Sequence, residues 1–305
     1  MSFIKATGKC FNYHGRWSRT EDGMMQSHWP VYFDFRIKAE SFTLIFDRRT
    51  QGYTYSLDGN LLSAVGSSAD AKFYVDPNEF HTVRISYCNG KFPMYFKGIE
   101  TDGEVKAAPD RPKYNLFVGD LFSTALSYFP ERVISAEKCD HDTIAMTGIA
   151  LCNGHGTYSE NPIGMETALF CLECPKEEVP LTELDTKKLR VPDKIFISLG
   201  LGDDLENTEN TEAFKKTYVE FITKICALWK TAKVYMLLPV CDSENGLRFD
   251  TVEAAAKEAA AKNKNAKFIS TRSVKTELAN DGVTPTAESC RAYSDFILDK
   301  LKIKN

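Results

Sequence analysis

The chain has 305 residues, of which 43% are hydrophobic and 26% are charged, and its formal net charge is -4. This composition is typical of a globular protein with one large domain or two ordinary ones. The weakly acidic balance gives no general electrostatic attraction to nucleic acid or to an anionic membrane, so we expect neither as a partner. No apolar run approaches the roughly 20 residues that a membrane-spanning helix needs.

Residues 1–108 are predicted to form a β-sandwich of the jelly-roll kind. Val31, Phe33, Phe35 and Ile37 recur with period two, as in a strand that buries one face. Asp58-Gly59 and Asn89-Gly90 are typical of hairpin turns. Several short strands at this spacing favour a sandwich of two antiparallel sheets. The further strands that we predict are 41–47, 71–76, 81–87 and 94–99.

Residues 109–305 are predicted to form a three-layer α/β/α domain with a parallel sheet. The period-two pattern of the first part ends at a proline-containing linker over 107–112. Beyond it, strand-like runs alternate with helical ones, which is the pattern of such a domain. The predicted strands are 114–118, 143–146, 194–199, 233–238 and 267–270, and the predicted helices are 211–230, 250–262 and 287–302.

Nine cysteines are scattered along the chain. Their odd number and irregular spacing argue against a disulfide framework, and the first ten residues lack the apolar segment of a secretory signal. We therefore expect free thiols and a cytoplasmic location. Cys171 and Cys174 have the spacing of a metal-ligand pair, but no second pair is well placed, so we expect no metal and no other cofactor.

Four short motifs follow one another within residues 109–305. The first ends an apolar run at a strand-to-helix turn, where many hydrolases expose a nucleophile. The four are Gly119-Asp120-Leu121, Ala145-Met146-Thr147-Gly148, Gly200-Leu201-Gly202-Asp203 and Asp281-Gly282-Val283-Thr284-Pro285. In this order they resemble the motif blocks of SGNH (GDSL-type) hydrolases. The resemblance is greatest to the acetyl-xylan-esterase-like carbohydrate esterases, which carry an N-terminal jelly roll. Two N-terminal elements, Gly15-Arg16-Trp17 and Ser27-His28-Trp29-Pro30, are similar to that family as well.

The resemblance implies a catalytic site whose three chemical side chains are absent here. It places the serine nucleophile at Leu121, the oxyanion-binding asparagine at Gly202 and the histidine base at Thr284. Leucine has no heteroatom to attack a carbonyl group, and threonine does not accept a proton near neutral pH. Asp120, Gly148 and Asp281 are retained, and the resemblance implies that the Gly148 N–H helps to form the oxyanion hole. We therefore predict a catalytically inactive member of the fold.

Other residues near these motifs are weaker candidates for a site. Ser123 lies beyond the turn and is better explained as a residue that binds backbone N–H groups at a helix start. The run 139–142 gathers a thiol, an imidazole and two carboxylates, but neighbours in sequence rarely converge on one point, so we expect a polar loop. Cys152 and His155 follow Gly148, and these three are our candidate ligand-binding residues.

The function that we expect is a protein-binding scaffold or adaptor with an unidentified protein partner. Arg16, Trp17 and Trp29 are the candidate anchors for that partner. Packing in the protein interior is the more common role of a tryptophan in a sandwich. Two alternatives stay open. The chain binds a small ligand or glycan in the degenerate pocket, or it is an active esterase with relocated catalytic residues.

Overall fold

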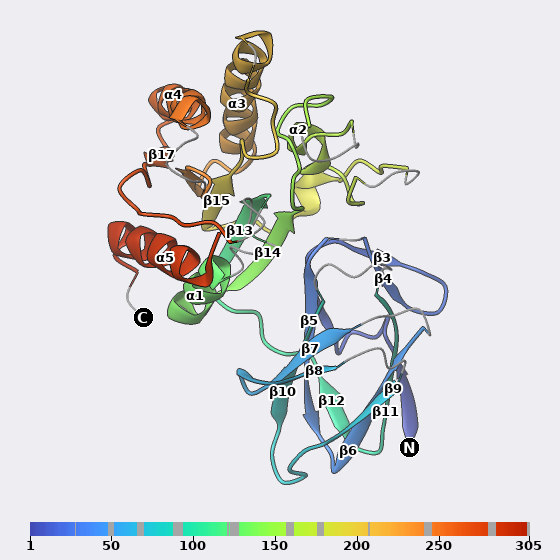
Figure 1. The fold of residues 1–305 in the computed structure, drawn as a ribbon. Helices are drawn as coiled ribbons and strands as arrows, with labels where there is room; N and C mark the ends of the chain where they lie inside the picture. Colours follow the sequence, from blue (N-terminus) through green and yellow to red (C-terminus); the bar gives the residue numbers. More distant parts are fainter. Residues whose placement is uncertain are drawn as a thin grey trace. The chain divides into compact units, whose positions relative to one another are not determined.

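The computed structural model describes residues 1–27, 29–47, 52–65, 70–87, 94–120, 122, 128–156, 162–175, 180–206, 208–240, 246–279 and 285–303. The chain forms two compact units (Figure 1). The first comprises Met1–Asp110 and Leu172–Cys174, and the second comprises Arg111–Cys171 and Pro175–Asn305. From the sequence we expected the division between residues 108 and 109. The segment Leu172–Cys174 is tied to the first unit by a hydrogen bond of 2.9 Å from the Cys174 N–H to the Ser27 carbonyl oxygen.

The first unit is a β-sandwich, which confirms the predicted architecture. One antiparallel sheet has the strand order β3-β4-β11-β6-β9, and β1 also pairs with β11. The other has the order β12-β5-β10-β7-β8, and β2 also pairs with β5. The strands are β1 (Ser2–Lys5), β2 (Asn12–His14), β3 (Trp17–Arg19), β4 (Met24–Gln26), β5 (Val31–Lys38), β6 (Ser41–Phe46), β7 (Tyr53–Leu57), β8 (Asn60–Val65), β9 (Asp70–Tyr74), β10 (His81–Tyr87), β11 (Tyr95–Thr101) and β12 (Glu104–Lys106).

Aromatic side chains fill the space between the two sheets. Phe33 of β5 is fully buried and stacks on Phe96 of β11, with ring centroids 4.3 Å apart. Phe11 packs edge-on against Phe96 at 5.2 Å. Burying each such side chain contributes about 1.5–3 kcal/mol, and the alternation of inward apolar residues places these rings on one face of each sheet.

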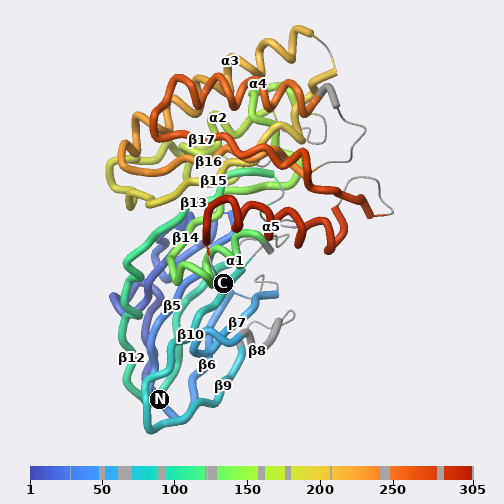
Figure 2. Tube along the Cα trace, turned by 90° about the vertical axis from the view of Figure 1, so that its left-hand side faces the viewer, coloured from blue at the N-terminus to red at the C-terminus, as the bar shows by residue number. Residues whose placement is uncertain are grey.

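The second unit has a five-stranded parallel sheet with the order β14-β13-β15-β16-β17. Figure 2 shows α3 and α4 on one face of this sheet and α1 and α5 on the other, so the predicted three-layer domain is confirmed. The elements are β13 (Tyr114–Gly119), α1 (Tyr128–Glu137), β14 (Asp140–Ala145), α2 (Met165–Ala168), β15 (Lys194–Ser198), α3 (Thr208–Leu228), β16 (Lys233–Leu237), α4 (Gly246–Lys262), β17 (Ala266–Ile269) and α5 (Ala287–Leu301).

The polar run 139–142, which we expected to be a loop, is mostly strand. Asp140 begins β14 and pairs with Tyr114 in the parallel sheet. The Asp140 carboxylate is buried but paired, because it accepts hydrogen bonds of 2.8 Å from the Arg111 N–H and from Arg190. The loop prediction was wrong because these partners, distant in sequence, compensate the charge of a residue type that is rare in strands.

The strand order locates the region where a ligand is expected. The chain passes from β13 to β14 on one side and then crosses to β15 on the other side of β13. In open α/β sheets, ligands bind outside the carboxyl ends of the strands at such a reversal. Gly119 and Ser198, which end β13 and β15, are register partners at this edge.

Candidate functional site

The Gly119-Asp120 turn lies at the carboxyl end of the central strand. A Cβ atom at Gly119 would lie 2.5 Å from the Ser198 carbonyl oxygen, so the close approach of β13 and β15 requires glycine here. Asp120 is fully buried directly after this glycine. Leu121, at the expected nucleophile position, lies outside the described residues, as do Ser123, Asp281 and Thr284.

Gly148 lies in a tight turn that follows β14 at the same edge of the sheet. The Met146 N–H donates to the Gly119 carbonyl oxygen at 3.3 Å, and the Ile149 N–H donates to the Met146 carbonyl oxygen at 3.1 Å. Gly148 has a φ of 77°, a left-handed conformation that glycine adopts without strain. A tight turn is therefore present at the position where the resemblance implies an oxyanion-binding N–H.

Gly202 packs directly against this turn. A Cβ atom at position 202 would lie 2.5 Å from the carbonyl oxygens of both Gly148 and Ile149. Real Cβ atoms essentially never approach a backbone oxygen so closely. The structure thus brings the second and third motifs together. The close contact leaves no space for an asparagine side chain at position 202.

Asp203 joins the same two loops through its carboxylate. It is 1% exposed and accepts hydrogen bonds from the Leu151 N–H at 2.8 and 3.0 Å and from the Cys152 N–H at 3.1 Å. Burial raises the pKa of Asp203 to about 6, against the lowering effect of these bonds and of Arg248. The Arg248 guanidinium donates to the carbonyl oxygens of Gly200 and Leu201.

Cys152 and His155 belong to the same joined loops. The Cys152 thiol is buried, and burial together with the negative charge of Asp203 raises its pKa to about 12. A thiol with so high a pKa is protonated near neutral pH and is a poor nucleophile. The half-buried His155 accepts a bond of 2.9 Å from the Asp204 N–H through its carbonyl oxygen. Ligand binding by Gly148, Cys152 and His155 stays a prediction.

The three candidate anchors of the first unit differ in exposure. Trp29 is 0% exposed and Arg16 is 4% exposed, which agrees with the packing interpretation. Trp17 is half-buried, and its ring packs edge-on against Tyr13 with centroids 5.0 Å apart. The Trp17 indole N–H donates to the His14 carbonyl oxygen at 3.0 Å. Only Trp17 of the three keeps part of its surface exposed, and partner binding through any of them stays a prediction.

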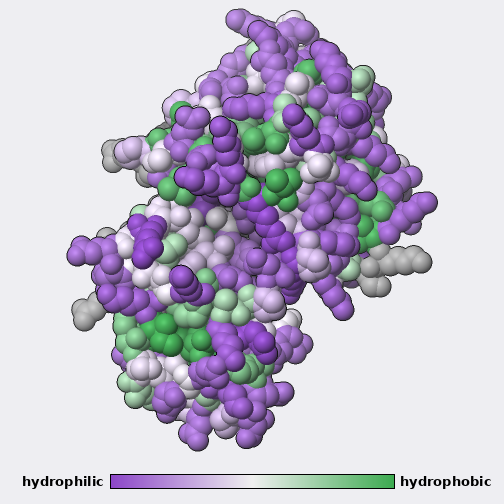
Figure 3. All heavy atoms as spheres, turned by 180° about the vertical axis from the view of Figure 1, so that it is seen from behind, coloured by the Kyte–Doolittle hydropathy of each residue, from purple (hydrophilic) through white to green (hydrophobic). Residues whose placement is uncertain are grey.

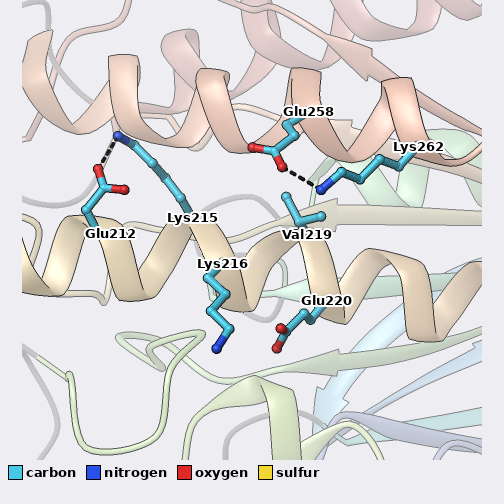
Figure 4. Close-up of a pocket in the computed structure, with 7 residues that line it drawn as sticks. All are labelled: Glu212, Lys215, Lys216, Val219, Glu220, Glu258 and Lys262. Carbon is cyan, nitrogen blue, oxygen red and sulfur yellow. Dashed lines mark hydrogen bonds and ion pairs between the residues drawn. The ribbon is translucent and has the colours of Figure 1, made fainter.

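A cavity of about 270 Å³ lies between α3 and α4 (Figure 4). It is lined by Glu212, Lys215, Lys216, Val219, Glu220, Glu258 and Lys262. Lys215 and Glu212 pair at 2.8 Å, and Lys262 and Glu258 pair at 2.6 Å. None of the expected site residues lines it, and paired charges of this kind are usual on exposed helix faces.

Within the described part of the chain, no group of three or more His, Cys, Asp or Glu residues is arranged to hold a metal ion. Seven cysteines fall in that part, and all seven are free thiols. Among the helices that the structure describes, none combines the length and the apolar composition of a membrane span. On the face shown in Figure 3, hydrophilic side chains predominate and apolar ones form small patches.

No family model and no curated protein matches the sequence. Solved structures do match over nearly the whole chain. A family two carbohydrate esterase from Cellvibrio japonicus has a TM-score of 0.81 at 14% identity and covers 99% of this chain and 97% of its own. A carbohydrate esterase whose active site is described as having divergent catalytic and non-catalytic binding functions has a TM-score of 0.76 at 16% identity, with 97% and 98% covered. A family two carbohydrate esterase from Clostridium thermocellum in complex with cellohexaose has a TM-score of 0.76 at 15% identity, with 96% and 100% covered.

These likenesses confirm the predicted two-domain fold. The chain has the fold of the family two carbohydrate esterases, a β-sandwich followed by an SGNH-like α/β domain.

Proposed function

We propose that this chain is a member of the SGNH carbohydrate-esterase family that has lost ester hydrolysis and acts by binding. The observation that carries the proposal is the packing of Gly202 against the carbonyl oxygens of Gly148 and Ile149. This packing accounts for the absence of an asparagine at position 202, because the two loops approach each other too closely to leave room for its side chain. An isolated exchange of one side chain would leave the space for asparagine open.

The lost groups account for most of the catalytic power of such a site. Removing a member of a catalytic triad costs a factor on the order of 10⁴–10⁶ in rate, and removing one oxyanion donor costs about 10²–10³. The resemblance implies that Leu121 and Thr284 occupy two triad positions and that Gly202 occupies the donor position. The alternative of relocated catalytic residues gains little support from Cys152, because its buried thiol has a pKa of about 12.

For the bound partner, we propose another protein inside the cytoplasm. Two compact units offer large surfaces that need no catalytic chemistry. Free thiols at all seven described cysteines are compatible with a reducing compartment. Trp17 is the proposed anchor, because its ring is partly exposed, whereas Trp29 and Arg16 are buried.

A carbohydrate is the second candidate for the bound partner. Two fold neighbours favour a carbohydrate. The active site of one is described as having non-catalytic binding functions, and the other is in complex with cellohexaose. In this alternative the degenerate pocket beside Gly148 and Gly202 retains a ligand without transforming it.

The test of lost hydrolysis is a p-nitrophenyl acetate assay on the purified full chain. We expect no turnover above buffer, and the same result with Cys152→Ser. Turnover that survives repurification and disappears in one of the variants Cys152→Ser, Ser123→Ala or His155→Ala would overturn the proposal and establish a relocated site. Affinity capture with the full chain, repeated with Trp17→Ala, separates the two partner classes. A protein partner released by that substitution supports the scaffold.

A further inference from the structure

We propose that the edge of the parallel sheet at which its strands begin is a docking surface for an acidic segment of a partner protein. We call this surface the basic edge, and it consists of Lys113, Lys138, Lys194, Lys233, Lys264 and Lys267. It lies wholly within the second unit. The inference rests on the proposed binding function and deepens it, because it names the chemistry that the partner presents.

The sheet topology brings these lysines to one edge. All pairings between neighbouring strands of this sheet are parallel, so the strands begin at the same edge, and Figure 2 shows them stacked in the order β17, β16, β15, β13 and β14. Lys194 and Lys233 are the first residues of β15 and β16, and Lys267 is the second residue of β17. The remaining lysines lie one or two residues before β13, β14 and β17, and these are Lys113, Lys138 and Lys264.

Most of the positive charge at this edge is not neutralised. Lys194 and Lys233 are register partners on neighbouring strands, and like charges in such positions are unfavourable unless another group compensates them. Lys194 donates to the Glu137 carboxylate, which also lies 3.7 Å from the Lys113 ammonium group. Within the described part of the chain, no hydrogen bond or ion pair reaches the ammonium groups of the other four lysines, which are all exposed: Lys138, Lys233, Lys264 and Lys267.

The carboxylates at the starts of these strands are already engaged within the unit. Glu137 also accepts a hydrogen bond of 2.9 Å from the Asn115 side-chain N–H. Asp140 is 2% exposed and is bound by the two arginines described above. Asp193 accepts a bond of 2.8 Å from the Tyr114 N–H. The charges that this edge presents to a partner are therefore mainly those of its lysines.

Helix ends do not account for this row of lysines. Lysine is favoured in the last turn of a helix, because the partial charge there is negative. The last turns of α1 and α3 contain no basic residue, and Lys233 and Lys267 lie on strands. In a chain with a net charge of -4, the concentration of unpaired cations along one edge indicates a surface that meets negative charge.

The size and the chemistry of the basic edge fit an extended acidic peptide. The steps across the strands, from β14 to β17, span ~19 Å, and an extended peptide advances ~3.3 Å per residue, so about six residues cover the edge. A lysine ammonium group has three donors and no acceptor, which suits the carboxylate oxygens of glutamate and aspartate. Single-stranded nucleic acids bind basic surfaces with the help of aromatic rings that stack on their bases. Tyr114, at the start of β13, and Trp229, shortly before β16, are both buried and offer no such ring.

Fluorescence anisotropy of a labelled decaglutamate peptide, titrated with the full chain at low salt, tests the proposal. We expect saturable binding that is weakened at least fivefold in the double variant Lys233→Glu with Lys267→Glu. Raising the salt concentration to about 300 mM should weaken the binding as well, because exposed charges are screened. The control is Lys5→Glu with Lys9→Glu, which makes the same change in net charge at two exposed lysines of the first unit. This control should bind the peptide within about twofold of the unchanged chain.

Thermal unfolding establishes that each variant is folded, which we expect because all four substituted lysines are exposed. Absence of saturable binding, or equal weakening in the two double variants, overturns the basic edge. A labelled single strand of ten thymidines that binds more tightly than the peptide, and is released by Lys233→Glu with Lys267→Glu, would assign the edge to nucleic acid and overturn the proposal too. The ester assay and the capture through Trp17 do not involve these lysines, so failure of the proposed function and failure of the basic edge are distinguishable.

Discussion

Gly202 and Gly148 are in backbone contact, and a Cβ atom at residue 202 would lie 2.5 Å from the Gly148 carbonyl oxygen. The third and second motifs therefore meet through main-chain atoms. A main-chain contact does not relax as easily as the end of a flexible side chain, so any larger residue at 202 must displace one of the two loops.

Gly202→Asn is expected to destabilise the fold by about 1–3 kcal/mol, the usual range for overpacking a tight site. Gly154→Asn is the matched control, because a Cβ atom at Gly154 meets nothing within 4 Å and its φ of 76° is one that asparagine tolerates. Urea unfolding of both variants measures the difference. Equal stability of the two variants would contradict the close contact at Gly202.

Restoring the triad is expected to yield little activity. The double variant Leu121→Ser with Thr284→His supplies a nucleophile and a base but lacks one oxyanion donor, which costs about 10²–10³ in rate. Adding Gly202→Asn should give no further gain, because the asparagine does not fit beside Ile149. Steady-state ester hydrolysis by the double and triple variants checks this. A triple variant that is at least a hundredfold faster than the double variant would show that the loops yield after all.

Asp203→Asn is expected to flatten the dependence of stability on pH between about 4 and 7. The pKa of Asp203 is raised from 3.8 in the unfolded chain to about 6 in the folded protein. A raised carboxyl pKa means that the folded state holds the proton more tightly, so this contribution is present at low pH and is lost as pH rises through 6. At about 1.36 kcal/mol per pKa unit the loss is of the order of 2–3 kcal/mol.

Urea unfolding at several pH values measures this slope. Asp204→Asn removes a carboxylate from the same loop and serves as the control, with the slope of the unchanged chain expected. In Asp203→Asn the amide oxygen can still accept from the Leu151 and Cys152 N–H groups at the place of Oδ1, so these two bonds are kept while the charge and the second Leu151 contact are lost. An unchanged slope in this variant would show that the Asp203 carboxyl group is not the one that titrates.

Asp58→Asn is expected to lower the pKa of His81. The His81 Nδ1 lies 2.8 Å from the Asp58 carboxylate, and this hydrogen bond is the main cause that raises the pKa of His81 above its ordinary 6.5. The corresponding stability is full below pH 6.5 and is lost as pH rises through the folded pKa. Asparagine tolerates the φ of 51° at position 58, so the turn is kept.

Titration of the His81 ring protons by NMR measures the change. Glu79→Gln should lower the pKa less, because its charge contributes less than the bond to Asp58. An equal response to both substitutions would refute the dominance of this bond.

Cys10 is expected to react before the other described cysteines. It is half-buried, whereas Cys139, Cys152, Cys171, Cys174, Cys226 and Cys290 are buried. Alkylation of the native chain, followed by peptide mapping, gives the order of labelling. Denaturation without reductant should then make all seven reactive, and several thiols that stay protected would indicate disulfides and contradict a reducing compartment.

The sequence predicted the element types because periodicity and short motifs are local signals. The runs at 194–199 and 233–238 became β15 and β16, and 287–302 became α5. The motifs also marked Gly148 and Gly202 as neighbours of a site. The four residues of α2 carry too little periodicity to be detected from the sequence.

The sequence did not reveal which residues, distant along the chain, form hydrogen bonds and ion pairs with one another. Nothing local shows that the Asp203 carboxylate accepts from Leu151 and Cys152, about fifty residues earlier, or that Arg111 and Arg190 allow Asp140 to begin a strand. Such pairings depend on the tertiary fold, and they decide whether an acidic residue is exposed or buried.

The segment Leu172–Cys174 belongs to the first unit but is synthesised after the first residues of the second unit. Because the Cys174 N–H satisfies the Ser27 carbonyl oxygen, the β-sandwich lacks this contact until the ribosome has released a good part of the α/β half. Nascent chains that stop near residue 110 contain the strands β1 to β12 of the sandwich but lack this one contact. The first unit therefore acquires this contact only after residue 174 has been synthesised, although its two sheets are encoded by the first 106 residues.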